Sequence, residues 1–384
     1  MIDSFKEKIR NLLIIFGIKK SKTGRYIVSK TSNWIVKPWI YLLYVSDYDR
    51  NNVECRHQNV RETREMVRIM NECGYNVFVH DWSKKPYFPL INVKVIIGIA
   101  PYFEDVCKRY PNAKKIYFAT GAYYLHQNMQ IKYMTNWVNA KYNTDIPYVR
   151  LIEPHHAIEV CDLILMIGSK YSKATYPQFC QNKIHIINQS SLVQNCNYTK
   201  QTMKLGKRKE YLFMASTGNV LRGVPLLIDY FTQHSDFILH WIGDLDEDFK
   251  EIIDGGKIPS NIIRYGVLEM NSHKMHSIVS QVNFILYPSG SEGGAPGSVI
   301  NAMQYGLIPL VTPWSAFNEI DEYGYMMNDW SIDAIQKAIT WAESLTNSDI
   351  EKRRLAVHNF AQKEWSLSRY SKEFMDYMTN FVCK

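Results

Sequence analysis

Cysteine is scarce in this chain of 384 residues, and the seven cysteines stand singly along it. There is no Cys-x-x-Cys pair and no cysteine at metal-ligand spacing from histidines, so we expect neither a zinc site nor a disulfide framework. His155 and His156 are adjacent, and neighbouring side chains diverge, so we expect no metal site there either. This cysteine usage favours a reducing compartment, and we therefore expect a cytoplasmic protein.

Long apolar runs are also missing. The longest run near the start, residues 12–18, is much too short to span a bilayer. It has basic residues on both sides and no small-residue cleavage site after it, so it does not fit a signal peptide. No Gly-x-Gly-x-x-Gly follows a predicted strand, so a nicotinamide dehydrogenase is poorly supported.

The composition is that of a globular protein, with 46% hydrophobic and 21% charged residues. A chain of this length exceeds one ordinary core, which predicts two domains. The formal net charge of +8 favours an anionic partner such as a nucleotide or a membrane surface. The basic residues form no patch interleaved with aromatic side chains, so we expect no nucleic-acid partner.

Residues 1–36 form a basic arm in which apolar residues fall on one helical face, at Phe5, Ile9, Leu12, Leu13 and Phe16. Such a helix suits peripheral binding of residues 1–30 to an anionic membrane surface. It equally suits a helix packed onto the first domain with a solvated basic face. The sequence leaves both readings open.

The rest of the chain alternates predicted strands and helices, which indicates parallel sheets with helices on both faces. The first domain, residues 37–200, has expected strands at 40–45, 75–80, 93–99, 115–118, 163–167 and 184–188. The second domain, residues 201–363, has expected strands at 211–215, 237–242, 262–265, 284–287 and 308–311. Residues 364–384 are predicted as a final helix. In such sheets ligands bind at the carboxyl ends of the strands.

One stretch, residues 287–312, carries the most specific pattern. Residues 288–297 contain four glycines and two prolines between the strands at 284–287 and 308–311, too many for a regular element. A helix is expected from about Ser298, whose hydroxyl suits an N-cap, to the residue before Gly306. Free backbone N–H groups at that helix start attract phosphate, and Glu292 lies inside the loop. The pattern favours a ligand with both a phosphate and hydroxyl groups.

This stretch resembles the donor-binding signature of retaining GT-B glycosyltransferases of family 4 (glycosyl transferases group 1). The matching residues are Pro288-Ser289, Glu292-Gly293, Pro296, Asn301-Ala302-Met303, Gly306 and Ile308-Pro309-Leu310-Val311. Two features depart from the family: one extra residue separates the two acidic positions, and Asn301 replaces the second acid. The resemblance implies a GT-B fold, in which two Rossmann-like domains face each other across a cleft and the last helix crosses back to the first domain.

The resemblance also implies roles for individual residues. Glu292 would face the transferred sugar, and Asn301 would hold the ribose without a charge. The glycine-rich loop and helix start would cradle the donor phosphates, through Gly293, Gly294, Gly297 and Ser298.

A second motif, residues 215–227, resembles the family's Gly-x-x-x-x-Lys-Gly element. Gly218 follows a predicted strand, and Arg222 stands where the family has a lysine that grips the donor diphosphate. A cation at a helix start is unfavourable for the helix dipole, which favours a phosphate-binding role over a structural one. The family often has another arginine near the end of the first strand, and this chain has Ser216 at that position.

Other candidate residues follow from weaker matches. Gly266 and Val267 end a predicted strand where the family cups the nucleotide base. His126, in the loop 120–128, is either a first-domain histidine that approaches the sugar or a core or capping histidine. Asp244 and Asp246 form Asp-x-Asp, but acids before a helix complement its dipole, so we expect no metal.

The resemblance implies a metal-independent hexosyltransferase that uses a nucleotide-sugar donor and no cofactor. It would act with retention on a glycan or lipid-linked glycan acceptor in bacterial polysaccharide synthesis. An alternative is a degenerate protein that binds a nucleotide sugar or glycan without turnover. Three departures from the family favour it: Asn301, Ser216 and the lack of paired glycines in the loop 46–57. A nucleotide-sugar epimerase shares the fold, but it would need a clear acid/base set.

Overall fold

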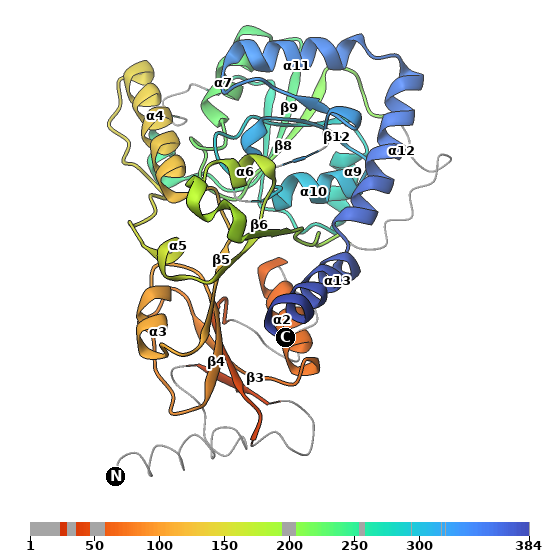
Figure 1. Cartoon of the computed structure of the whole chain (residues 1–384). Helices are drawn as coiled ribbons and strands as arrows, with labels where there is room; N and C mark the ends of the chain where they lie inside the picture. The colour runs from red at the N-terminus through yellow and green to blue at the C-terminus, as the bar shows by residue number, and fades with distance from the viewer. Residues whose placement is uncertain are drawn as a thin grey trace.

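The computed structural model describes residues 24–28, 36–46, 58–193, 205–252, 258–292, 294–315, 317–318 and 320–383. Most of the predicted basic arm, nearly all of the loop 46–57 and Gly293 lie outside these residues. The described chain forms two sheets with helices around them, one in each half of the molecule (Figure 1). None of the described helices is long and apolar enough to cross a membrane.

The first sheet has seven strands in the order β1-β3-β2-β4-β5-β6-β7. Every neighbouring pair is parallel except β1 and β3, which are antiparallel. Its strands are β1 (Arg25–Ile27), β2 (Trp39–Tyr44), β3 (Asn76–Asp81), β4 (Val93–Gly98), β5 (Lys114–Ala119), β6 (Leu163–Ile167) and β7 (Ile184–Ile187). All six residues of β2 are buried, because helices cover both faces of a parallel sheet. β1 falls in the stretch predicted as a basic arm and adds an edge strand that the sequence reading missed.

The second sheet has six strands, all parallel, in the order β10-β9-β8-β11-β12-β13. They are β8 (Glu210–Met214), β9 (Ile238–Ile242), β10 (Ile262–Gly266), β11 (Phe284–Tyr287), β12 (Ile308–Val311) and β13 (Tyr325–Met326). The strand order reverses between β8 and β11, so the loops after these two strands meet at a switch point, where such sheets bind ligands.

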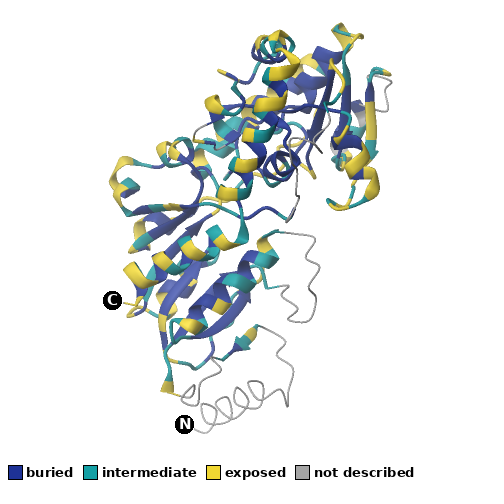
Figure 2. Cartoon of the chain, turned by 90° about the vertical axis from the view of Figure 1, so that its right-hand side faces the viewer, coloured by how far each residue is buried: buried dark blue, intermediate teal, exposed yellow. Residues whose placement is uncertain are grey.

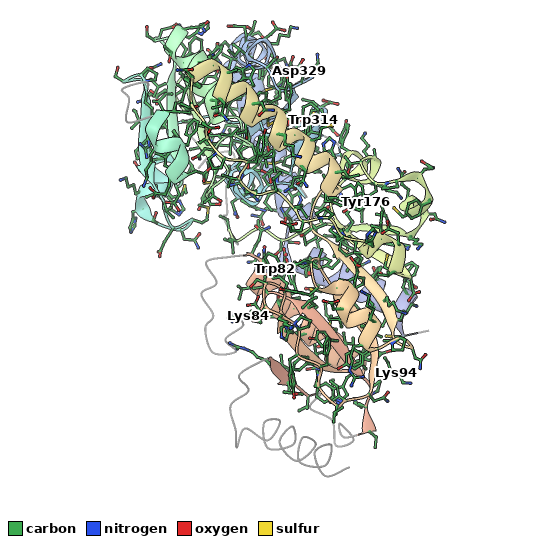
Figure 3. All side chains as sticks on the ribbon, turned by 90° about the vertical axis from the view of Figure 1, so that its left-hand side faces the viewer. Trp82, Lys84, Lys94, Tyr176, Trp314 and Asp329 are labelled. Carbon is green, nitrogen blue, oxygen red and sulfur yellow. The ribbon has the colours of Figure 1, made fainter. Side chains whose placement is uncertain are left out.

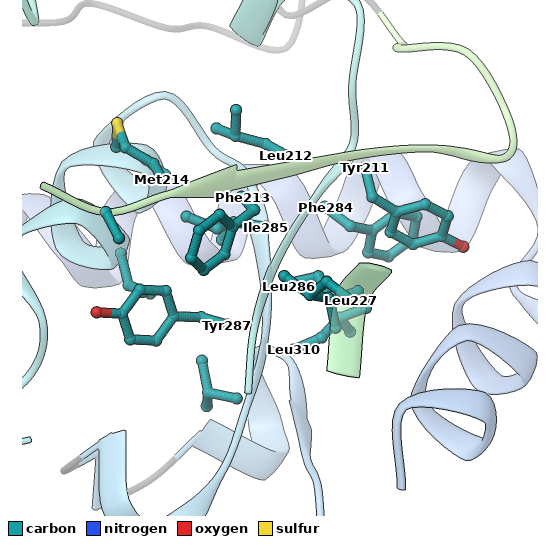
Figure 4. Close-up of a cluster of buried hydrophobic side chains, with 14 of the residues drawn as sticks. Tyr211, Leu212, Phe213, Met214, Leu227, Phe284, Ile285, Leu286, Tyr287 and Leu310 are labelled. Carbon is teal, nitrogen blue, oxygen red and sulfur yellow. The ribbon is translucent and has the colours of Figure 1, made fainter. Parts of the chain in front are cut away.

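Aromatic rings hold the centre of this second sheet together (Figure 4). Tyr211 on β8 stacks on Phe284 on β11 with ring centroids 5.7 Å apart, and Phe213 stacks on Tyr287 at 5.8 Å. All four rings are buried. The rings anchor β11 directly before the glycine-rich loop, so the loop starts from a rigid position.

The helices cover the sheets with their apolar faces, so strands are buried and the outer helix surfaces are exposed (Figure 2). Beside the first sheet lie α2 (Gln58–Glu72) and α3 (Phe103–Arg109), whereas α4 (Tyr124–Tyr142), which follows β5, packs on the second domain. Short helices follow as α5 (Ala157–Val160) and α6 (Lys170–Ala174). Around the second sheet lie α7 (Val224–Gln233), α8 (Glu247–Ile252), α9 (His273–Val279), α10 (Gly297–Gln304), α11 (Ile332–Ser344) and α12 (Asn347–Glu364).

The last helix crosses from the second domain to the first, as predicted. α12 ends at Glu364, and α13 (Leu367–Tyr377) packs on α2. Tyr370, Phe374 and Tyr377 of α13 belong to the same buried cluster as the β2 and β3 side chains. The chain therefore joins the two domains a second time through its C-terminal segment.

α4 makes a further connection, in the opposite direction. Its residues Ile131, Met134 and Val138 belong to the core of the second domain, although α4 follows β5 of the first sheet. Asp229 of α7 forms an ion pair with Lys141 and accepts a hydrogen bond from the Tyr142 hydroxyl at 2.9 Å. In Figure 3, α4 runs along the second domain. This helix fixes one side of the first domain against the second.

Candidate functional site

The two predicted motifs lie side by side at the switch point of the second sheet. The backbone N–H of Gly290, in the loop after β11, donates to the carbonyl of Leu221, in the loop after β8, at 2.8 Å. β8 and β11 are parallel neighbours, so both loops leave the same edge of the sheet. The motifs, read separately in the sequence, form one site.

An ion pair between Arg222 and Glu292 lies at the centre of this site. Arg222 Nε is 3.0 Å from Glu292 Oε1, and the two side chains are only 13% and 12% exposed. The Tyr287 hydroxyl donates to the same carboxylate oxygen at 2.8 Å, and Ser289 Oγ lies 3.3 Å from it. Arg222 Nη1 also donates to the carbonyl of Thr217. The predicted sugar-binding acid and the predicted diphosphate-binding arginine are thus direct partners.

Arg222 and Glu292 each stabilise the charged form of the other. Burial alone would raise the pKa of Glu292, but Arg222 and then Arg150 outweigh it, and the pKa is lowered. Burial opposes the charge on Arg222, yet Tyr287 and Glu292 raise its pKa above the ordinary value. Burial raises the pKa of Tyr287, which therefore stays a neutral donor. The pair of Arg222 and Glu292 therefore consists of one cation and one anion at neutral pH.

The glycines of the loop after β11 let the first domain approach. A Cβ on Gly294 would lie 2.5 Å from Ile167 Cγ2 at the end of β6, and a Cβ on Gly297 would lie 2.5 Å from Gln58 Oε1 at the start of α2. The loop therefore sits between the two sheets, with room only for backbone. The sequence predicted these glycines as a phosphate cradle, and the structure gives them this additional role in domain contact.

The helix after this loop begins one residue earlier than predicted. α10 starts at Gly297, its N-cap is Pro296, and no side chain caps it, so the prediction of Ser298 as N-cap is wrong. Proline at this position fixes the backbone before the helix without a hydroxyl cap. Ser298 therefore lies in the first turn, among the N–H groups that have no intrahelical partner.

The loop after β8 is held by Asp246. Its carboxylate accepts from the backbone N–H groups of Gly218 at 3.0 Å and Asn219 at 2.7 Å. Gly218 has φ +78°, which a side chain would disfavour. Asp246 thus supports the loop, and no three His, Cys, Asp or Glu residues in the described part of the chain are grouped to hold a metal ion.

Asn301 lies on α10 at the place where the resemblance implies ribose binding. Its side chain is buried, and Oδ1 accepts from the backbone N–H groups of Leu192 at 2.8 Å and Val193 at 3.0 Å. These residues follow β7, so Asn301 ties the second domain to the end of the first. Ribose binding by Asn301 stays a prediction.

The predicted base-binding residues lie at the edge strand of the second sheet. Gly266 ends β10 with φ +69°, and Val267 is 64% exposed. In the strand order β9 separates β10 from β8, the strand that leads to Arg222. A Cβ on Gly266 would meet nothing within 4 Å, so both residues are accessible, and base binding by them stays a prediction.

His126 lies on α4 and not in a loop, because the helix begins at Tyr124. Its Nε2 is buried and has no hydrogen-bond partner among the described residues, and burial lowers its pKa. Ser291 Oγ, beside Glu292, is also buried without such a partner. Buried polar atoms are normally paired, so both atoms mark places where a polar ligand would complete the bonding.

The sequence reading missed Arg150 as a site residue. It lies in the first-domain segment between α4 and α5, and its Nη1 is 3.5 Å from the carbonyl of Thr217 in the second domain. No local pattern signals this contact, because 67 positions separate the two residues. The nearest hint is its left-handed backbone, with φ +69° at a residue other than glycine.

A cavity of about 110 Å³ lies between the domains on the other side of the glycine-rich loop. Ile167 and Asn188 line it from the first domain, and Ala295, Asn318 and Trp365 line it from the second. The backbone N–H of Lys170 donates to Asn318 Oδ1 at 2.9 Å across the same junction. The cavity therefore lies at the junction of the two domains, and Ala295 of the glycine-rich loop is part of its lining.

No protein-family model matches the sequence, and no curated protein sequence matches it. Solved structures do. A glycosyltransferase from Rickettsia africae superposes with a TM-score of 0.57 and 13% identity, covering 90% of this chain and 100% of that one. Anabaena HepE in complex with UDP gives a TM-score of 0.57 at 8% identity, covering 90% and 100%.

A third similar structure is S. aureus TarM, solved with fondaparinux, alpha-GlcNAc-glycerol and UDP. It gives a TM-score of 0.50 at 12% identity, and the match covers 73% of this chain but 55% of TarM. At these identities the likeness shows the fold. The chain has the GT-B fold, with two parallel-sheet domains and a C-terminal helix that returns to the first.

Proposed function

We propose that this protein is a glycosyltransferase that moves a sugar from a nucleotide-sugar donor to a glycan or lipid-linked glycan acceptor, with retention of configuration. The observation that carries the proposal is the buried pair of Arg222 and Glu292 at the switch point, beside the start of α10. The similar structures with UDP bound have the same fold and support a nucleotide-sugar donor.

The leaving diphosphate would gain negative charge as the glycosidic bond breaks. Arg222 and the free N–H groups of Gly297 and Ser298 would stabilise that charge electrostatically. Donor binding would exchange the contact of Arg222 Nη1 on the Thr217 carbonyl for a phosphate oxygen, while Nε stays on Glu292. The arginine would then bridge the acid and the donor.

Glu292 would orient the sugar and would not attack it. Its carboxylate already accepts from Tyr287 and Arg222 through one oxygen, Oε1, which leaves Oε2 for sugar hydroxyls. Holding the ring in place positions the anomeric carbon for the acceptor. The resemblance implies that the departing phosphate takes the acceptor proton, so no second carboxylate is required.

The first domain would complete the sugar site. His126 Nε2 and Ser291 Oγ are two of the buried polar atoms without a hydrogen-bond partner in the described part of the chain, and a donor or acceptor hydroxyl would pair with them. The lowered pKa keeps His126 neutral, so it would exchange hydrogen bonds without adding charge. The acceptor would enter from the first domain, and a role in bacterial polysaccharide synthesis belongs to this proposal.

Three finer points are also proposals. Catalysis would need no metal, since Arg222 and the α10 N–H groups supply the positive charge. The protein would be cytoplasmic, and residues 1–30, of which the structure describes only 24–28, would bind an anionic membrane surface. Deleting residues 1–23, which leaves β1 in place, would then reduce activity on a lipid-linked acceptor but not donor hydrolysis. Unchanged activity on the lipid-linked acceptor would contradict the role of the arm.

The degenerate alternative has one specific observation in its favour. Asn301 Oδ1 already accepts from the N–H groups of Leu192 and Val193, so this oxygen would accept from a ribose hydroxyl only if the junction opened. A protein of this kind would bind a nucleotide sugar without transferring it.

The test is a thermal-shift and turnover screen against UDP-, GDP-, dTDP- and ADP-sugars, with and without EDTA, for wild type and Glu292→Ala. We expect stabilisation by one nucleotide family and slow, EDTA-insensitive donor hydrolysis that Glu292→Ala abolishes. Stabilisation without turnover, even with glycan acceptors present, would favour the degenerate binder. Absence of binding to every nucleotide sugar would overturn the proposal.

A further inference from the structure

Arg150 reaches from the first domain onto the loop that follows β8 of the second. Its Nη1 lies 3.5 Å from the carbonyl of Thr217. A Cβ placed on Gly218 would be 2.8 Å from Arg150 Nη1 and 3.1 Å from its Cδ. The arginine therefore rests on bare backbone, and Gly218 is the residue that leaves space for it.

The start of α4 holds the segment that carries Arg150. Asn128 Nδ2 donates to the carbonyl of Ile152 at 2.8 Å, and Asn128 Oδ1 accepts from the Ile152 N–H at 2.8 Å. Gln127 Nε2 donates to the carbonyl of Arg150 itself at 3.3 Å. The backbone of Arg150 adopts φ +69°, a strained region for this residue type. The contacts with α4 hold the backbone around Arg150, and the loop after β8 contacts its exposed side chain.

The other end of α4 is anchored to the second domain through Lys141 and Asp229. The helix that positions Arg150 is thus attached to the same domain as the loop that Arg150 contacts. A cation held this way faces the site whenever α4 is docked. A freely moving surface arginine would have neither the hydrogen bonds from α4 to its own segment nor the ion pair that attaches α4 to the second domain.

Two guanidinium groups converge on one carbonyl oxygen. Arg222 Nη1 donates to Thr217 O, and Arg150 Nη1 approaches the same atom. Arg150 also acts on Glu292, whose pKa it lowers together with Arg222. The two positive charges repel each other, and an anion bound between them would offset that repulsion. The loop amides of Gly218 and Asn219 are already bonded to Asp246. The geometry therefore leaves the two arginines as the side chains that face an incoming phosphate.

We propose that Arg150 is the second cation of a diphosphate-binding site and that the first domain supplies it. It would take the place of the basic group that the family resemblance sets at Ser216. The inference rests on the proposed function, because the diphosphate would be that of the nucleotide-sugar donor. With one guanidinium for each phosphoryl group, tight binding requires both domains together.

The test is calorimetric titration of UDP, GDP, dTDP, ADP and inorganic pyrophosphate into wild type, Arg150→Gln, Arg150→Lys and Lys132→Gln. Lys132 is an exposed cation on α4 and serves as the matched control for net charge. We expect Arg150→Gln to weaken binding of the preferred nucleoside diphosphate by about tenfold to a hundredfold, the loss of one charge-assisted contact. Arg150→Lys should lose less, and Lys132→Gln should bind as wild type does.

The same titrations separate the two proposals. If wild type binds a nucleoside diphosphate and Arg150→Gln binds it equally well, Arg150 only joins the domains and this inference falls, while the proposed function stands. If Lys132→Gln weakens binding as much as Arg150→Gln, net charge alone is responsible and the inference also falls. If wild type binds none of the five probes, both proposals are overturned.

Discussion

Arg222 and Glu292 form a buried ion pair, Nε to Oε1 at 3.0 Å, although 70 positions separate them in the sequence. Removing two charges from water is costly, and well-packed apolar residues would often be as stable. The pair lies at the strand-order reversal of the second sheet, next to the unpartnered Ser291 hydroxyl. Position and cost together make this pair the best candidate for function in the described chain.

The pair predicts the behaviour of Glu292→Gln. Glutamine keeps the shape, but it leaves the Arg222 charge buried without a counter-charge. We expect donor turnover to fall by about a hundredfold or more. We also expect the free energy of unfolding to fall by about 3 kcal/mol. Donor hydrolysis and urea unfolding measure the two effects. Glu247→Gln on α8, whose side chain is 82% exposed, is the control, and a Glu292→Gln protein as active as wild type would refute the site.

The close approach of Gly294 to Ile167 predicts an effect of one methyl group. Gly294→Ala would place Cβ 2.5 Å from Ile167 Cγ2, so we expect a loss of stability of about 1–3 kcal/mol from overpacking. Ile167→Ala removes that methyl group and should relieve the clash in the double variant. A double-mutant cycle of urea unfolding would then show that the two losses of stability are not additive. Gly121→Ala has its nearest atom at 3.8 Å and should be neutral. Additive losses in the double variant would contradict the proposed clash.

Glu62 on α2 predicts a pH dependence of stability. Burial raises its pKa to about 7, against the opposing hydrogen bonds from Ser190 and the charge of Arg61. The folded state therefore holds a proton that the unfolded state, with a pKa of about 4.3, releases first. The contribution of Glu62 to stability is greatest below pH 4, falls as pH rises towards 7 and is constant above.

The variant Glu62→Gln should remove this dependence, because the amide oxygen still accepts from the Ser190 N–H and hydroxyl. We expect it to be more stable than wild type at pH 8 by on the order of 3 kcal/mol, with equal stability near pH 4. Urea unfolding at a series of pH values measures this. Glu72→Gln, an exposed residue of the same helix, is the control. If the free energy of unfolding of wild type and of Glu62→Gln changed with pH in the same way, the raised pKa of Glu62 would be contradicted.

Asp229 predicts how strongly α4 is held on the second domain. Asp229→Ala removes the partner of Lys141 and of the Tyr142 hydroxyl, so we expect a loss of about 1–3 kcal/mol in the free energy of unfolding. Protection of α4 amides from hydrogen exchange should fall with it. Asp236→Ala, which breaks an exposed pair with Lys209, should change neither quantity. Unchanged exchange in α4 would show that apolar packing alone holds the helix.

Local patterns predicted the strands well because the central strands are buried on both sides. The predicted ranges 163–167, 284–287 and 308–311 match β6, β11 and β12. The sequence pattern did not predict a helix at α4. Its exposed residues Leu125, Met129 and Tyr133 are as apolar as its buried ones, so no single stripe marks the packed face.

The sequence by itself determined the two parallel-sheet domains and the glycine-rich loop with its acid, and the family resemblance of that loop implied the returning helix. Burial, strand length and turn chemistry are properties of short segments, and the pattern of residue types records them. Only the tertiary structure decided that Glu292 pairs with Arg222, that Asn301 bonds to the end of the first domain and that Arg150 crosses to Thr217. These contacts join residues from 67 to 109 positions apart, and they depend on how two separately formed sheets are placed against each other.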